Sequence, residues 1–134
     1  MRKLARTSLV YMIVGLVFGV YYREFTKFTD FTGETQLSVL HTHTLVLGMV
    51  FFLVVLLLEK NFGLSRQKHF NKFYLFFNLG LVVTLGMLLL HGTLTVLGYP
   101  DSAAISGIAG IGHILLTIGL GFFFNSLLKS LPQT

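Results

Sequence analysis

Four histidines lie in apolar stretches of this sequence, where ionisable side chains are rare. The segment LHTHTLVLG at residues 40–48 places His41 and His43 at the start of a long apolar run, and His91 and His113 lie in later runs. Ionisable groups in hydrocarbon are costly and usually serve a function. Neutral imidazole is also the commonest metal ligand among protein side chains. These four residues are therefore candidate ligands for a metal ion or a haem iron.

The other residue types narrow the possible chemistry. The chain contains no cysteine, which excludes disulfides, thiolate metal sites, iron–sulfur clusters and the thioether attachment of c-type haem. Hydrolytic or nucleophilic catalysis is not supported, because no Asp or Glu stands beside a histidine in an apolar stretch to orient it. A di-iron centre needs several inward carboxylates, whereas Glu34 and Asp101 lie too near the ends of the apolar stretches. Any metal or haem must therefore be held by His, carboxylate, Met or backbone groups, without a covalent thioether.

The composition is that of an integral membrane protein. Of the 134 residues, 54% are hydrophobic and only 11% are charged, which is too little polar surface for a soluble domain of this size. Four apolar stretches reach the length of about 20 residues that a helix needs to cross a bilayer. We expect these spans at about residues 4–22, 37–58, 73–98 and 103–128. The short loops predict a single all-α domain over residues 1–134, an up-down four-helix bundle in the membrane.

The charged residues lie mainly outside these spans. We expect a loop or interfacial segment at 23–35 and a tight turn at 98–101. Most Lys and Arg residues lie at the N-terminus, in the loop 59–72 and in the C-terminal tail, so the positive-inside rule places both termini and that loop in the cytoplasm. His69, in this loop, is expected to be solvated. No basic patch with interleaved aromatics occurs elsewhere, so the expected partner is the lipid bilayer and not nucleic acid.

Helical periodicity indicates how the histidines of the last two spans are oriented. His91 shares a stripe with Gly80, and His113 shares one with Gly110. Small residues mark helix–helix faces in membranes, so we expect both rings to point into the bundle. Each ring lies eleven residues from a turn centred near Ser102. We therefore expect His91 and His113 at similar depth in the outer half of the membrane.

In the second span, two histidines lie two residues apart. Such residues project about 200° from each other on a helix. The small residues in phase with His41 predict that it faces inward, while His43 faces a neighbouring helix or the headgroups. In the first span, Gly15 and Gly19 lie at the depth of these rings. They leave room for a flat cofactor, although this spacing is also typical of close helix packing.

This pattern predicts a haem held between two imidazoles. Spans 2 and 4 are diagonal in an up-down bundle, so His41 and His113 are the expected axial pair, with His91 and His43 nearby. Arg23 lies at the outer end of the first span. The haem propionates would emerge there, and Arg matches carboxylates geometrically. The same position also suits an ordinary interfacial anchor.

Two other interpretations stay open. A copper or zinc site could use three or four of the rings of His41, His43, His91 and His113, because imidazole suits both ions. Alternatively, the chain is a cofactor-free structural or transport accessory subunit whose histidines are hydrogen-bonded core residues. The colour and metal content of the purified protein distinguish the three possibilities.

The run LHTHTLVLGMVFFLVV at residues 40–55 resembles the second membrane span of the catalytic subunits of haem–copper oxidases and nitric oxide reductases. The resemblance implies that His41, at the matching position, ligates a haem b. The whole chain resembles a family of small four-span bacterial membrane proteins that carry this H-x-H motif. The histidines on spans 2 and 4 are also similar to those in half of a haem A synthase and in the core bundle of cytochrome b.

These resemblances imply a haem b protein of the bacterial cytoplasmic membrane. Its implied role is electron transfer, haem or gas sensing, or support of a respiratory complex, with another membrane or respiratory subunit as partner. They do not imply oxidase activity, because the crosslinked copper site and the later spans of the oxidases are absent.

Overall fold

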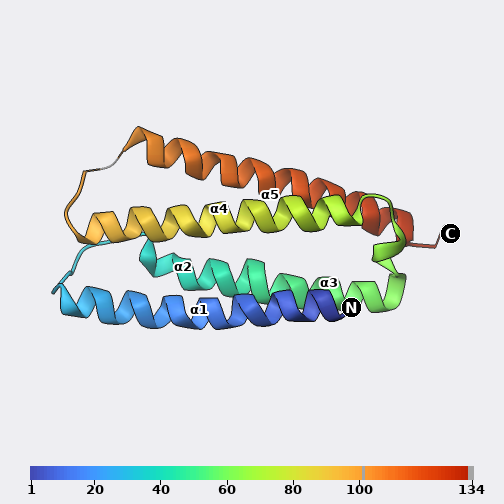
Figure 1. The fold of residues 1–134 in the computed structure, drawn as a ribbon, viewed down its shortest axis with the longest axis horizontal. Helices are drawn as coiled ribbons and strands as arrows, with labels where there is room; N and C mark the ends of the chain where they lie inside the picture. The colour runs from blue at the N-terminus through green and yellow to red at the C-terminus, as the bar shows by residue number, and fades with distance from the viewer. Residues whose placement is uncertain (101, 133–134) are drawn as a thin grey trace.

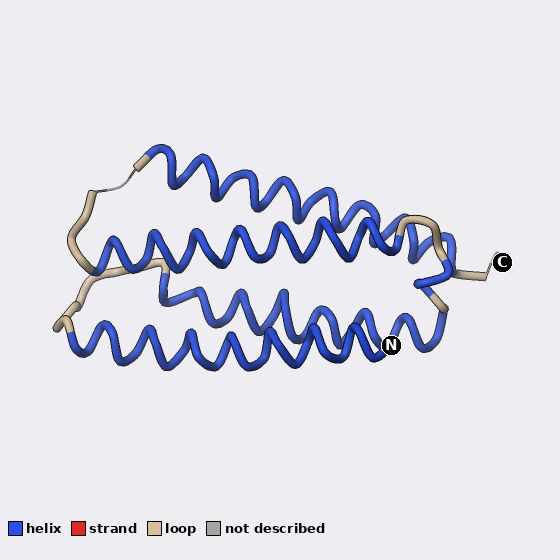
Figure 2. The backbone as a smooth tube through the Cα atoms, viewed as in Figure 1, coloured by secondary structure: helices blue, strands red, loops and turns tan. Residues whose placement is uncertain are grey.

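Four long antiparallel helices make up the computed structural model, which describes residues 1–100 and 102–132 (Figure 1). The elements are α1 (Arg2–Phe28), α2 (Leu37–His43), the π-helix η1 (Thr44–Val50), α3 (Phe51–Phe62), the short 3-10 helix η2 (Leu64–Arg66), α4 (Phe70–Val96) and α5 (Ala103–Ser130). Within the described residues there is no strand (Figure 2). Because α2, η1 and α3 follow one another without a break, the described residues form four helices long and apolar enough to cross a membrane. The predicted all-α four-helix bundle is confirmed.

The first helix is longer than predicted. It continues to Phe28, so of the loop or interfacial segment expected at 23–35, a loop is wrong for residues 23–28. The hydroxyl of Thr26 donates a hydrogen bond to the Tyr22 carbonyl at 2.8 Å, and that of Thr29 donates one to the Phe25 carbonyl at 2.9 Å. No proline or glycine interrupts this stretch. The polar segment therefore stays helical past the apolar span.

Helix ends coincide with residues that cannot continue a helix. Gly63, with φ of 64°, ends α3, and Gly98, with φ of 79°, follows α4. Both prolines, Pro100 and Pro132, lie outside the helices. Glycine adopts such left-handed conformations at little cost. The turn expected at 98–101 is described as far as Pro100, and Asp101 lies outside the described residues.

The helices form two tightly packed pairs. In one pair α1 packs along α2, η1 and α3, and in the other α4 packs along α5. The pairs meet where α2 contacts α4 and where side chains of α1 hydrogen-bond to α4. Figure 1 shows α5 diverging from α4 towards the end at which α5 begins.

Phenylalanines fill the core near the α3–α4 connection. Phe52, Phe73 and Phe77 are almost fully buried. The ring of Phe51 stacks on Phe77 with centroids 4.5 Å apart and meets Phe123 of α5 edge-on at 5.4 Å. Such aromatic pairs stabilise beyond the area that they bury. This cluster holds α5 against the other helices at one end, while His41, His43 and His91 lie towards the other end.

Candidate functional site

Glycines bring the backbones of α4 and α5 into contact. A Cβ atom added at Gly80 would lie 2.6 Å from the backbone nitrogen of Leu116, and one added at Gly119 would lie 2.7 Å from that of Phe77. Both distances are far below van der Waals contact, so only glycine fits there. This packing determines which faces of the two helices meet and how they are aligned.

The alignment separates His91 from His113 in depth. A Cβ atom on Gly112 would lie 3.0 Å from the backbone nitrogen of Thr84, so these two residues are level. His113 is then level with residue 83, eight residues from His91, or about 12 Å along the axis. The prediction of similar depth is wrong. The connection is not a symmetric turn, because α4 ends five residues after His91 whereas α5 begins ten residues before His113.

His113 lies on the outer face of α5. It shares that face with Gly110 and Thr117, as predicted, but all three are exposed. The face towards α4 is instead formed by Gly112 and its neighbours in phase. The Nδ1 atom of His113 is 3.0 Å from the carbonyl oxygen of Ala109. The expectation that this ring points inward is wrong, because both faces of α5 carry small residues.

His91 lies on the face of α4 that packs against α5. Gly80 and Thr84, in phase with it, are buried in that interface, and His91 is half-buried. The hydroxyl of Thr95, one turn later, donates a hydrogen bond to the His91 carbonyl at 3.0 Å. The predicted inward orientation of this stripe is confirmed.

His41 is half-buried and faces α1. A Cβ atom on Gly19 would lie 3.8 Å from Cβ and Cγ of His41. The Nδ1 atom of His41 is buried and has no hydrogen-bond partner. Its Nε2 atom lies 3.4 Å from the Thr42 hydroxyl, which is long for a hydrogen bond. The predicted inward orientation is confirmed, and the ring combines burial with an unsatisfied nitrogen.

The other histidine of the motif has a local partner. The Nδ1 atom of His43 lies 2.9 Å from the Val39 carbonyl oxygen, one helical turn earlier. An Nδ1–H donating to this carbonyl leaves Nε2 as the remaining nitrogen, which is the arrangement found in many metal-ligating histidines. His43 is half-buried, so it remains a possible ligand.

A π-helix follows the two histidines directly. The segment Thr44–Val50 packs against α1, where Gly48 lies against the ring of Tyr11. The Ser8 hydroxyl of α1 donates a hydrogen bond of 2.9 Å to the Met49 carbonyl oxygen. This carbonyl of the π-helix therefore has a hydrogen-bond partner on the neighbouring helix. π-helical turns are rare and often lie at functional sites. Apolar periodicity does not reveal such a segment, and sequence analysis missed it.

The first-span glycines serve helix packing. A Cβ atom on Gly15 would lie 2.7 Å from Cδ2 of Leu45. That distance leaves no space at Gly15 for a flat cofactor, so the close-packing interpretation holds there. Gly19 is less crowded and has only His41 near it.

Arg23 and His69 are the remaining residues for which the sequence predicts a position. Arg23 is exposed on α1, with its Nε atom 3.5 Å from a carboxylate oxygen of Glu24, and exposed pairs of this kind contribute little to stability. The ring of His69 stacks on Phe122 of α5 with centroids 5.5 Å apart. Its Nδ1 atom is buried without a partner, so the expectation of a solvated side chain is wrong.

The electrostatic surroundings of His69 disfavour its protonated form. Loss of hydration lowers the pKa of the His69 imidazole, and the positive charges of Lys72, Lys129 and Lys68 lower it further. The cations come from the α3–α4 connection, from α4 and from the end of α5. His69 therefore favours the neutral form.

The structure gathers only some of the candidate ligands. His41 lies four residues after the start of α2 and His91 lies five residues before the end of α4, which is the same end of the bundle. Among residues 1–100 and 102–132, no group of three or more His, Asp or Glu side chains is placed to hold a metal ion. His41 is half-buried, and its Nδ1 atom is buried without a hydrogen-bond partner. His113, its expected partner, points away from the bundle.

Comparison with known proteins places the chain in a family. Residues 1–130 match the model of a family described as "Protein of unknown function (DUF2871)". No curated protein and no solved structure matches the chain. Because the family match covers all four helices, the chain belongs to the DUF2871 family.

Proposed function

We propose that this protein binds haem b at the end of the bundle where α2 begins and α4 ends, with His41 as an axial ligand. The observation that carries the proposal is the inward, half-buried ring of His41, neither of whose nitrogens has a short hydrogen bond. Its Nδ1 atom has no partner, and its Nε2 atom lies 3.4 Å from the Thr42 hydroxyl. Coordination of an iron by Nε2 would fix the orientation of this ring. The adjacent π-helix and the resemblance of this span to oxidase haem-binding spans support the same residue.

The second axial ligand has to lie at the same end of the bundle as His41. His91 is the best candidate within one copy, because it comes from a different helix at the same end of the bundle. His43 is the next candidate. His113, on the outer face of α5, would have to ligate after a rotation of α5. Arg23 lies at the same end and remains the candidate for pairing with the propionates.

The role that follows is that of a redox or sensory membrane protein. Bound haem supplies one-electron chemistry or gas binding, while the residues of this chain position the iron and exclude water. The positive-inside rule places both termini in the cytoplasm and the haem towards the outer face of a bacterial cytoplasmic membrane. Electron transfer, haem or gas sensing and support of a respiratory complex all fit this arrangement.

Histidine variants test the proposed ligation. The protein is produced with added haem precursor and purified in detergent, and its absorption spectrum is recorded before and after dithionite. We expect His41→Ala to abolish the six-coordinate spectrum and His69→Ala to leave it unchanged. Parallel His91→Ala, His43→Ala and His113→Ala variants identify the second ligand. Full haem content with an unaltered spectrum in His41→Ala would contradict the assignment, as would a colourless wild type that holds stoichiometric copper or zinc.

A further inference from the structure

A groove runs along the seam between α1 and α4. It consists of three hollows of about 450, 330 and 460 Å³ that follow one another along the helices. The first and second hollows share Val10 and Tyr11, and the second and third share Phe18 and Gly86. The groove is therefore continuous, and none of the five histidines lines it.

One end of the groove is basic and polar. Lys3 and Arg6 line it there, and the Nζ atom of Lys3 lies 3.6 Å from the centroid of the Tyr74 ring. The hydroxyl oxygens of Thr7 and Tyr74 are 2.6 Å apart. None of the described residues that line the three hollows is acidic. This end is thus suited to a negatively charged group.

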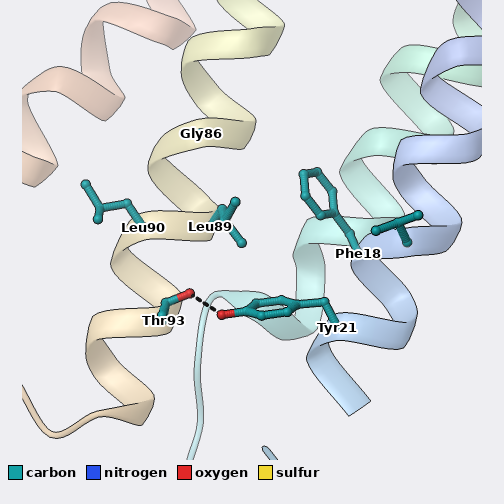
Figure 3. Close-up of a pocket in the computed structure, with 7 residues that line it drawn as sticks. Phe18, Tyr21, Gly86, Leu89, Leu90 and Thr93 are labelled. Carbon is teal, nitrogen blue, oxygen red and sulfur yellow. Dashed lines mark hydrogen bonds between the residues drawn. The ribbon is translucent and has the colours of Figure 1, made fainter. Parts of the chain in front are cut away.

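The rest of the groove is apolar and of limited length. From Val10 to Tyr21 its walls are almost entirely hydrocarbon, including Phe18 and Leu89. It ends where the Tyr21 hydroxyl lies 2.9 Å from the Thr93 hydroxyl (Figure 3). That stretch of α1 measures about 16 Å along its axis. The apolar part of the groove therefore matches half of a hydrocarbon core of about 30 Å.

Side-chain contacts bridge the groove at three places. Hydrogen bonds cross the seam at Thr7–Tyr74, at Tyr11–Asn78 and at Tyr21–Thr93. A flexible hydrocarbon chain can follow a seam that is bridged in this way, whereas a partner's helix, about 10 Å across, would have to displace these contacts.

We propose that this groove binds one anionic phospholipid. Its phosphate contacts Lys3 and Arg6, since ammonium and guanidinium groups both form charge-assisted hydrogen bonds with phosphate oxygens. One acyl chain enters the apolar part of the groove at Val10 and lies along it towards Phe18. The acyl chain passes Gly86, where an added Cβ atom would have no atom within 4 Å. Lys3 and Arg6 thereby bind a lipid in addition to any effect on topology.

The charged end is tested by native mass spectrometry of the purified full-length protein. The protein is loaded with equal amounts of phosphatidylglycerol and phosphatidylcholine, and we expect it to retain one phosphatidylglycerol preferentially. The double variant Lys3→Gln/Arg6→Gln loses two contacts and should bind phosphatidylglycerol about thirty-fold more weakly. The control Arg66→Gln/Lys72→Gln removes the same number and types of charge at the same end of the bundle but outside the groove. It should bind like the wild type.

The apolar part is tested with a glycine substitution. Gly86→Leu places a side chain in the groove, and its Cβ atom meets no atom within 4 Å, so the retained phosphatidylglycerol should be lost while the helix content by circular dichroism is kept. The control Gly121→Leu, at another uncrowded and exposed helical glycine, should retain the lipid. Equal retention of the two lipids by the wild type, or equal loss in the two charge variants, overturns the proposal. Unchanged binding in Gly86→Leu also overturns it.

Discussion

At the scale of single residues, two described imidazoles combine a buried Nδ1 atom with the lack of a hydrogen-bond partner, and their surroundings differ. His41 lies at the interface of α1 and α2 beside a glycine. His69 lies against an aromatic ring outside the long helices, among lysine cations. The cations work against a positive charge on His69, whereas His41 packs against Gly19 of α1. Of these two imidazoles, His41 is the one that lies within a helix long and apolar enough to cross a membrane.

The first prediction concerns the stability of the cofactor-free protein. Replacing His41 by leucine removes a buried nitrogen that has no partner and adds an apolar side chain at a helix interface. We expect His41→Leu to raise the free energy of unfolding of the apoprotein by about 1 kcal/mol, while haem binding is lost. Thermal unfolding in detergent measures the first effect and the absorption spectrum the second. A His41→Leu apoprotein less stable than wild type would mean that the ring already has a structural partner.

The second prediction concerns pH. The pKa of His69 lies below its ordinary value of 6.5, so the folded state binds this proton less readily than the unfolded chain. Stability is then fully present above the unfolded-state pKa and falls as the pH drops below about 6.5. We expect His69→Gln to lose less stability than the wild type between about pH 8 and about pH 5. Melting temperatures across this range provide the measurement, and parallel curves for the two proteins would refute the prediction.

At the scale of elements, the seam between α4 and α5 depends on glycines. Gly80 meets backbone atoms of α5, which cannot move aside as a flexible side chain can. Gly86, less than two turns later on the same helix, faces open space. The two glycines have the same helix propensity. Comparing substitutions at the two positions therefore separates the effect of packing on stability from the effect of helix propensity.

The third prediction uses this matched pair. Gly80→Ala forces α4 and α5 apart and should lower the free energy of unfolding by about 1–3 kcal/mol. Gly86→Ala meets nothing and should raise it by up to about 1 kcal/mol through helix propensity. Denaturation followed by circular dichroism compares the two variants. Equal effects in the two variants would show that the close α4–α5 contact does not contribute to stability.

At the scale of the whole molecule, sequence analysis predicts the number and order of the helices, because a span of about 20 apolar residues is readable without tertiary contacts. It also predicts which residues share a face, since each residue advances by a constant angle. It does not predict which way a face points when a helix has two small faces. On α5 the stripe of Gly112 packs inward, and the stripe of Gly110 and His113 remains outside.

Periodicity also does not predict how deep in the membrane a residue lies, or whether a segment is an α-helix or a π-helix. The depth of His113 depends on where the α4–α5 loop ends, and that loop is asymmetric. The π-helix depends on contacts with α1, such as the packing of Gly48 against Tyr11. Sequence analysis therefore identifies His41 as an inward ring but pairs it with a residue that lies elsewhere. From the sequence, Lys3 and Arg6 have a role only in membrane topology. The groove that they line forms between α1 and α4, so it is not apparent without the fold.

The fourth prediction tests the orientation of the molecule. The chain has no cysteine, so single cysteines can be introduced without background. Thr32→Cys, in the α1–α2 loop, should react with a membrane-impermeant maleimide on intact bacterial cells. Asn71→Cys, in the first turn of α4, should react only after permeabilisation, because the positive-inside rule places that end in the cytoplasm. The reverse labelling pattern would place the histidine-rich end inside the cell.

The most direct test of the haem proposal is a reduced-minus-oxidised absorption spectrum of the wild-type protein, purified after expression with added haem precursor. We expect a red protein with about one haem per chain, a Soret band that shifts on reduction and sharp α and β bands, which are typical of iron ligated by two imidazoles. A colourless preparation, folded by circular dichroism and without haem under these conditions, would contradict the haem proposal.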